Sequence, residues 1–487
     1  MKPFAFNASR RRLLLGSILP LTSGCFGGGA REVLRLAEGW PGTLPALFDD
    51  LERRTFDYFW DTTPASSGLV PDRYPTPSFS SIAAVGFGLT AYPIGVERGY
   101  ITRAQAIERV LATARFFHGA PQGPQASGTA GYKGFFYHFL DMQTGTRHGD
   151  VELSTVDTAL LMGGMLFCRS YFDRSSTDEA EIRRLVDEIY ARIEWPWMQV
   201  RSPAISHGWR PESGFIADDW KGYSEAMIVY ILALGAPTHP VAREAWLAWT
   251  STYELTWGRL YGPEHLTFTP LFGHQYSHVW IDFRGIRDSF MRRRGIDYLE
   301  NSRRAAYAQR AYAIANPMRW KGYGENVWGL TACDGPADVE LAYLGEVRRF
   351  RTYNARGVGI AYTSDDGTIA PTAAASCLPF APEIVIPAIE EMHRRYGEHV
   401  YGKYGFFDAF NPSFDYDAPL RHGRRIPGFG WVDTDYLGID QGPIIAMIEN
   451  HRSDLVWRTL RGNPHIRRGL ERAGFTGGWL DTPMHKP

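Results

Sequence analysis

Residues 207–240 read HGWRPESGFIADDWKGYSEAMIVYILALGAPTHP, and the character of the chain changes halfway along this stretch. The first half contains Pro211 and Gly214, which favour a loop. The second half contains an almost unbroken apolar run at 226–234, which predicts a buried helix with Ser224 as its N-cap. A helix that is apolar on every side has to be surrounded by other helices. The stretch therefore predicts a helical protein in which an aromatic loop leads into a buried helix.

Glu225 is expected at the point where this loop meets the helix. The helix dipole stabilises a charged carboxylate at a helix N-terminus. Packing against aromatic rings raises the pKa of a carboxyl group instead, as a general acid requires. Trp209, Trp220 and Tyr223 supply such rings, and they also offer flat surfaces on which a sugar can stack. Glu225 is therefore either a catalytic acid in a sugar-binding loop or a capping carboxylate in front of core aromatic residues.

The remainder of the chain alternates between two kinds of helix. Segments of the buried kind are expected at 80–97, at 154–171 and after Glu225, and amphipathic segments at 45–60, 102–117, 176–193 and 240–254. An inner ring of buried helices, each with an amphipathic partner outside, gives an all-α fold of the α/α toroid type. Short strands, such as the one expected at 135–140, fall in the loops that line a cleft. A helical solenoid is the competing architecture, but the chain shows no repeat of about 34–47 residues.

Composition narrows the class of protein. The chain has 487 residues, of which 44% are hydrophobic and 22% charged, so it can build a large core. Its formal net charge of −1 offers no basic field for nucleic acid. Aromatic residues make up 14%, a content typical of sugar-binding clefts and also of large aromatic cores. The sequence contains no P-loop, dinucleotide fingerprint or G-x-S-x-G elbow, so we predict no cofactor and no serine-hydrolase chemistry.

The first 30 residues are expected to be an export signal and a tether. Residues 9–15 read SRRRLLL, a twin-arginine-like charged region before an apolar run that is too short for a permanent membrane helix. LTSGC at 21–25 resembles a lipoprotein cleavage box, and a Gly-rich tether follows Cys25. We expect a periplasmic protein that is attached to the membrane only through a lipid at Cys25. Residues 31–487 are expected to form one domain.

The cysteines and histidines do not predict a metal site. Apart from Cys25, the chain has an odd number of cysteines and no C-x-x-C pair, which argues against a zinc site or a disulfide framework. His274 and His278 lie four residues apart, but the glycine and aromatic residues around them indicate a loop. His274 and Tyr276 are therefore expected to form hydrogen bonds with a substrate.

Several carboxylates lie where a loop enters a buried helix or an aromatic segment. Glu152 and Asp157 lie at the entry of the helix expected at 154–171, where a charge needs a partner or a ligand. Asp408 lies among aromatic residues in YGFFDAFNP, and Asp440 opens another buried helix, where it is either a site residue or a simple N-cap. Glycoside hydrolysis requires acids in such settings, one protonated at the leaving oxygen and one ionised to activate water.

The hexapeptide WKGYSE at 220–225 recurs as WKGYGE at 320–325. In a toroid this echo can mark two loops that reach the same cleft, and in an aromatic-rich chain it can also arise by chance. If the loops share a cleft, Glu325 is a substitute for the acid and Trp328 is a substrate contact.

Several motifs, in order, resemble the glucoamylase-like proteins of glycoside hydrolase family 144. They are ELSTVDTALL (152–161), WKGYSEA (220–226), GAPTHP (235–240), WKGYGENVWGLTACDG (320–335), GFFDAFN (405–411) and YLGIDQGPIIAMIEN (436–450). The resemblance covers roughly residues 45–475. It implies an (α/α)6 toroid and endo-acting, inverting hydrolysis of β-1,2-glucan to sophorose and short sophorooligosaccharides.

The same resemblance matches Glu225 to the general acid of the family and Asp408 to the general base, with Asp440 as the rival base. Glu152 and Asp157 match an acidic motif near the cleft. Related enzymes perform transglycosylation or release sophorose from chain ends, and these outcomes stay open. Two further classes also stay open: a non-catalytic glycan-binding lipoprotein, and a polysaccharide lyase with His274 or Tyr276 as its base.

Overall fold

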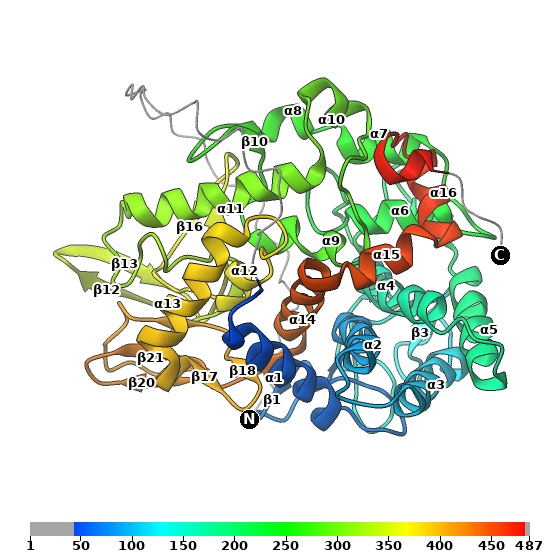
Figure 1. Ribbon diagram of the computed structural model, residues 1–487, viewed down its shortest axis with the longest axis horizontal. Helices are drawn as coiled ribbons and strands as arrows, with labels where there is room; N and C mark the ends of the chain where they lie inside the picture. Colours follow the sequence, from blue (N-terminus) through cyan, green and yellow to red (C-terminus); the bar gives the residue numbers. More distant parts are fainter. Residues whose placement is uncertain (1–42, 483–487) are drawn as a thin grey trace.

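The computed structural model describes residues 43–482, and Figure 1 shows α2, α4 and α14 near the middle of an assembly of helices. The expected export signal, tether and Cys25 lie outside the described residues. Within the described part, the predicted all-α toroid with short hairpins in its loops is confirmed. None of the described helices is both long and apolar enough to cross a lipid bilayer.

The inner ring consists of helices whose side chains are almost all buried. In chain order they are α2 (Ile82–Glu97), α4 (Thr155–Tyr171), α6 (Met227–Gly235), α9 (Tyr276–Trp280), α12 (Pro371–Ala375) and α14 (Gly438–Ser453). Helix α2 packs between α4 and α14, so the ring closes between its first and last members. The approach of α2 to α4 requires glycine, because a Cβ atom on Gly164 would lie 2.0 Å from the carbonyl oxygen of Gly86.

The outer helices are half-exposed, as their amphipathic sequences predict. They are α1 (Ala46–Thr62), α3 (Arg103–Gly119), α5 (Thr177–Ala191), α7 (Glu244–Thr250), α11 (Tyr298–Ala315) and α13 (Pro382–Val400). Shorter helices complete the structure: α8 (Tyr253–Thr256), α10 (Ser289–Arg294), α15 (Leu455–Arg461) and α16 (Pro464–Arg472). The helix predicted at 240–254 is thus broken into α7 and α8.

The strands are short and pair locally in the loops between helices. The pairs and triplets are β1 (Arg73–Tyr74) with β22 (Tyr436–Leu437), β2 (Ser80–Ser81) with β5 (Phe139–Leu140), β3 (Gly131–Tyr132) with β4 (Phe135–Phe136), β6 (Leu153–Ser154) with β7 (Gly208–Arg210) and β8 (Gly214–Phe215), β9 (Trp257–Gly258) with β10 (His265–Leu266), β11 (Ala332–Asp334) with β14 (Tyr353–Ala355), β12 (Val339–Tyr343) with β13 (Glu346–Phe350), β15 (Gly357–Val358) with β16 (Thr363–Ser364), β17 (Tyr401–Gly402) with β18 (Gly405–Phe406), and β19 (Phe410–Asn411) with β21 (Gly430–Val432) and β20 (Arg424–Ile426). The β12–β13 hairpin projects from the body in Figure 1.

The beginning of α6 differs from the prediction. Its N-cap is Ala226, and the Ser224 hydroxyl accepts a hydrogen bond from the Ala226 backbone N–H at 3.3 Å, within a turn before the helix. The helix therefore starts after Glu225, and the Glu225 carboxyl group belongs to the preceding turn.

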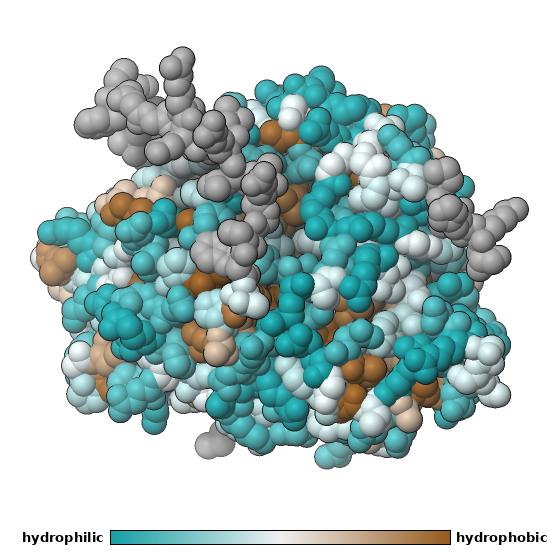
Figure 2. Space-filling view, viewed as in Figure 1, coloured by the Kyte–Doolittle hydropathy of each residue, from teal (hydrophilic) through white to brown (hydrophobic). Residues whose placement is uncertain are grey.

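One hydrophobic core extends through the described residues from Phe48 to Leu480. Cys168, Cys333 and Cys377 are buried in it as free thiols. The odd number of cysteines apart from Cys25 and the lack of a C-x-x-C pair argue against a disulfide framework. Figure 2 shows a face on which hydrophilic residues cover most of the surface and hydrophobic residues appear in small groups.

Candidate active site

A cavity with a volume of about 640 Å³ opens beside the turn before α6. Its walls come from that turn, from the segment 267–272 and from the loop that joins β15 to β16. Glu225, Trp220 and Tyr223 all lie in the wall. The sequence motif at 220–225 therefore reaches a single hollow with polar and aromatic surfaces, as a saccharide requires.

A second, smaller cavity of about 60 Å³ shares Glu225 and Phe272 with the first. His138, Asp157 and Tyr276 line this smaller cavity. Glu225 thus lies where two hollows meet, and only 5% of its surface is exposed.

The backbone around Glu225 is anchored to the inner ring by one side chain. The Ser277 hydroxyl, on α9, donates to the carbonyl oxygen of Glu225 at 2.9 Å. The same hydroxyl accepts a hydrogen bond from the Ile228 N–H at 3.0 Å. This bridge joins α6 to α9 and fixes the turn that presents the carboxyl group.

The predicted acids Glu152 and Asp157 are linked by His138. Nδ1 of His138 lies 3.2 Å from a Glu152 oxygen, and Nε2 lies 3.6 Å from an Asp157 oxygen. Arg210 donates to the other Glu152 oxygen at 3.1 Å, and Ser154 donates to Asp157. The sequence pattern did not single out His138, because it lies in an aromatic run that resembles a strand. The sequence did offer one signal for His138. Apart from the Tyr137 phenol, it is the only ionisable side chain in the short segment between β4 and β5.

Asp408 lies in a buried group of carboxylates. Oxygen atoms of Asp408, Asp334 and Asp433 lie within 4.8 Å of one another, a spacing at which carboxylates can share a cation or a proton. Burial, followed by the charge of Asp334, raises the pKa of Asp408 to about 6. Burial, followed by the charges of Asp334 and Asp408, raises the pKa of Asp433 well above its usual value. The guanidinium of Arg73 lies 2.7 Å from Asp334 and supplies positive charge to this group, and we assign no metal to it.

Asp440 connects this group with the smaller cavity. It is the third residue of α14 and not its N-cap, which is Leu437. A hydrogen bond with the Asp440 side chain counteracts the rise in the pKa of Asp408, so the two carboxyl groups lie close together. The adjacent residue, Ile439, lines the smaller cavity, and its carbonyl oxygen accepts a hydrogen bond from the Tyr276 hydroxyl at 3.1 Å.

Two residues predicted to contact substrate lie in the core instead. His274 is 0% exposed, its Nε2 lies 3.2 Å from the backbone of Phe268, and burial holds its pKa well below 6.5. Trp328 is 1% exposed. Neither residue lines the two cavities, so both are corrected to structural residues. Aromatic residues near a glycine have the same sequence pattern in a core as in a loop.

Trp209 and Glu325 are also corrected, for different reasons. Trp209 lies in β7 beside Arg210, which faces Glu152. Because side chains alternate along a strand, Trp209 points to the other face. There it packs against Trp197, with 5.5 Å between the ring centroids. Glu325 has a side chain that is 68% exposed and is paired with Arg310. The echo at 320–325 therefore does not bring a second acid to the cavities.

Comparisons with known proteins found similar sequences and similar structures. A family model described as "Putative glucoamylase" matches residues 217–464, about half of the chain. A solved structure of a putative glucoamylase from Bacteroides uniformis is 32% identical and has a TM-score of 0.74, with 90% of this chain and 100% of that one covered. The endo-β-1,2-glucanase from Chitinophaga pinensis, solved with sophorotriose and glucose, is 28% identical with a TM-score of 0.75, and the match covers 89% of this chain and 99% of that one.

A curated relative from Parabacteroides distasonis is an exo β-1,2-glucooligosaccharide sophorohydrolase that acts at the non-reducing end. It is 28% identical over 468 residues, which cover 90% of this chain. The match spans 59% of the length of that relative.

Proposed function

Because this chain belongs to the glucoamylase-like family that the model of residues 217–464 describes, we propose that it is a glycoside hydrolase that cleaves β-1,2-glucan to sophorose and short sophorooligosaccharides. The observation that carries the proposal is the position of Glu225 at the junction of two cavities. A general acid has to reach the oxygen between two sugars, and Glu225 has open space on two sides. Two of the similar proteins are named for hydrolysis of β-1,2-linked glucans.

In the proposed mechanism, Glu225 gives its proton to the glycosidic oxygen as the bond to the anomeric carbon breaks. Asp408 takes a proton from water, directly or through a substrate hydroxyl, and the water oxygen bonds to the anomeric carbon from the opposite face. The configuration at the anomeric carbon is thereby inverted. Two carboxyl groups about 6.5–9.5 Å apart suit this course, whereas about 5–5.5 Å suits retention.

We propose endo action, with exo release of sophorose and transglycosylation as the alternatives. Similar proteins include both an endo-acting and an exo-acting enzyme. An endo enzyme shortens long chains early, while an exo enzyme releases sophorose from the start and leaves the remaining polymer long. A transglycosylase makes new glycosidic bonds, so the number of reducing ends stays constant. A non-catalytic binding protein would retain β-glucan without producing any reducing ends.

The test is incubation of the protein with linear β-1,2-glucan, followed by chromatography of the products and NMR of the first anomer formed. Glu225→Gln is expected to lower kcat by at least about 10³-fold, because the amide cannot donate the acid's proton, while glucan binding stays within about threefold. Glu325→Gln is the matched control, because it removes the exposed acid of the echoed motif and should leave kcat unchanged. Full activity of Glu225→Gln would remove Glu225 from the mechanism.

We also propose that the protein is exported to the periplasm and carries a lipid at Cys25, on the basis of the sequence of residues 1–30. In a bacterial host, Cys25→Ser should move the protein from the membrane fraction to the soluble periplasmic fraction. An unchanged distribution between the two fractions would contradict lipidation.

A further inference from the structure

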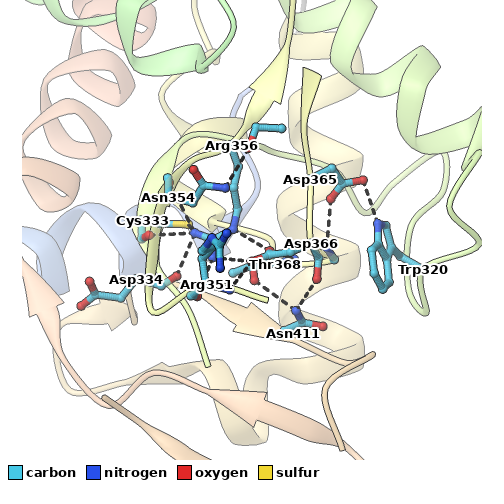
Figure 3. Close-up of polar contacts among 12 residues, drawn as sticks. Trp320, Cys333, Asp334, Arg351, Asn354, Arg356, Asp365, Asp366, Thr368 and Asn411 are labelled. Carbon is cyan, nitrogen blue, oxygen red and sulfur yellow. Dashed lines mark hydrogen bonds and ion pairs between the residues drawn. The ribbon is translucent and has the colours of Figure 1, made fainter. Parts of the chain in front are cut away.

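Arg356 is a fully buried cation at the centre of the polar contacts in Figure 3. Its Nε and NH2 atoms donate to the two oxygens of Asp366 at 2.6 and 2.8 Å, which is a bidentate ion pair. NH2 also donates to the carbonyl oxygen of Arg351 at 3.1 Å. A charge of this kind is costly to bury unless its donors are satisfied, so these contacts fix the guanidinium in one orientation.

The remaining nitrogen of Arg356 points toward the strand β11. NH1 donates to the carbonyl oxygen of Cys333 at 2.7 Å. The N–H of the same peptide group, which belongs to Asp334, donates to Oδ2 of Asp408 at 2.8 Å. A single amide therefore lies between the buried guanidinium and the proposed base.

Through this amide, the positive charge of Arg356 affects the carboxylate of Asp408. A cation at the carbonyl oxygen polarises the peptide group and makes its N–H a stronger donor, and such effects are larger where water is excluded. The bond from the Asp334 N–H lowers the pKa of Asp408, in opposition to burial and to the charge of Asp334. Arg356 thus favours the ionised form of Asp408 without touching it.

A second route ties the chain around Asp408 to the same ion pair. The Asn411 side chain donates to the carbonyl oxygen of Asp366 at 2.9 Å, and the backbones of Phe410 and Ile369 exchange hydrogen bonds at 2.8 and 2.9 Å. Together these hydrogen bonds form a closed network that holds both the side chain and the backbone of Asp408. Gly335 allows this close packing, because a Cβ atom there would lie 2.2 Å from Arg356 NH2.

We propose that Arg356, with Asp366, is a positioning residue that orients Asp408 through the Cys333–Asp334 peptide group. The proposal rests on the proposed role of Asp408 as general base. The other ionisable groups that face Asp408 are Asp334 and Cys333 from β11, Asp433 from the segment after β21, Asp440 from α14, and Arg73 from β1. Of these groups, Cys333 and Asp334 are in direct contact with Arg356, so variants that keep a hydrogen-bonding group at position 356 or 366 are needed beside its removal.

The test compares Arg356→Met, Arg356→Lys and Asp366→Asn with the unaltered protein, each checked for folding by circular dichroism. Arg356→Met should lower kcat on the order of 10²-fold with KM within about threefold, because misplacing a reacting group affects the chemical step. The acid side of the kcat/KM profile should move to higher pH, since Asp408 then ionises less readily. Arg356→Lys should restore part of kcat, because lysine still offers a donor to Cys333. If Arg356→Met does not fold, the other two variants carry the test.

Arg103→Lys is the matched control, since Arg103 forms a bidentate pair with the buried Glu179 between α3 and α5, outside both cavities. It should leave kcat and the pH profile unchanged. A folded Arg356 or Asp366 variant with unaltered kcat and an unaltered acid limb would overturn the inference, as would a change in KM alone.

A measurement without substrate separates this inference from the proposed function. The difference in Tm between the unaltered protein and Asp408→Asn should depend on pH. When the same pair is compared in the background of Asp366→Asn or Arg356→Lys, the pH range over which the two Tm values differ should extend to higher pH. A difference that is the same in all backgrounds would reject the role of Arg356. Lack of hydrolysis of β-1,2-glucan, with the shift present, would reject only the proposed function.

Discussion

Glu225 and Asp408 are held in opposite ways. The backbone of Glu225 is fixed by Ser277, while its side chain lies where two cavities meet. The Asp408 side chain is fixed by the N–H of Asp334 and is 1% exposed. Asp408 lines neither of the two cavities, so in the proposed mechanism water or a sugar hydroxyl has to reach a buried group.

This leads to a prediction for the dependence of activity on pH. Burial raises the pKa of Asp408 to about 6, so the base is protonated and inactive below that pH. The acid limb of kcat/KM should have its midpoint near pH 6 and not near the ordinary value of about 4 for aspartate. Initial rates between pH 4 and 8 measure this midpoint. Asp415→Asn, which removes an aspartate paired with Arg425, should not move it, and a midpoint near 4 in the unaltered protein would contradict the assignment of Asp408.

At the scale of elements, the contact between α1 and α14 contains a buried pair of acids. Glu52 of α1 is 0% exposed and faces Glu449 of α14, with Arg98 and Arg452 3.3 and 3.4 Å away from Glu52. Burial, followed by the charge of Glu449, raises the pKa of Glu52 to about 9, and the two arginines only partly oppose this rise. Folding therefore favours the protonated form of Glu52.

The free energy of unfolding should consequently fall as pH rises. The unfolded pKa of Glu52 is about 4.5 and the folded one about 9, so its contribution is complete below pH 4.5 and is lost as pH rises toward 9. Glu52→Gln, which stays neutral, should raise Tm at pH 8 and flatten the decline, as measured by thermal denaturation from pH 5 to 9. Asp49→Asn is the matched control, because Asp49 contacts the same two arginines from an exposed position. A Tm at pH 8 that is no higher in Glu52→Gln would contradict this account.

Across the whole molecule, the inner ring depends on close contacts between its successive helices. Gly164 of α4 lies against the backbone of Gly86 in α2, with no side chain between them. Gly164→Ala should destabilise the protein by about 1–3 kcal/mol or more, because the added methyl group has to push two helices apart. Thermal denaturation measures the loss. Gly119→Ala is the control, since a Cβ atom at Gly119 meets no heavy atom within 4 Å, and it should change Tm little. Equal Tm values for both variants would contradict the proposed role of the contact.

The architecture could be predicted from the sequence because buried and half-exposed helices have different periodicity, as the segments at 80–97 and 102–117 show. The site could be predicted only in part. Glu225 precedes a long apolar run, which reveals its position, whereas the surroundings of Asp408 come from residues 73, 334, 433 and 440, which only the fold brings together. His274 and Trp328 show the converse, because aromatic neighbours in sequence do not distinguish a core from a cleft.

The packing of α2 against α14 also has a consequence for how the chain acquires its structure. These helices are separated by more than 340 residues, so the apolar side of α2 stays uncovered until nearly the entire polypeptide has been made. Contacts of such long range form slowly and leave hydrophobic surface open to aggregation in the meantime. A nascent chain that ends before α14 should accordingly bind chaperones, and it should gain protease resistance only when α14 emerges.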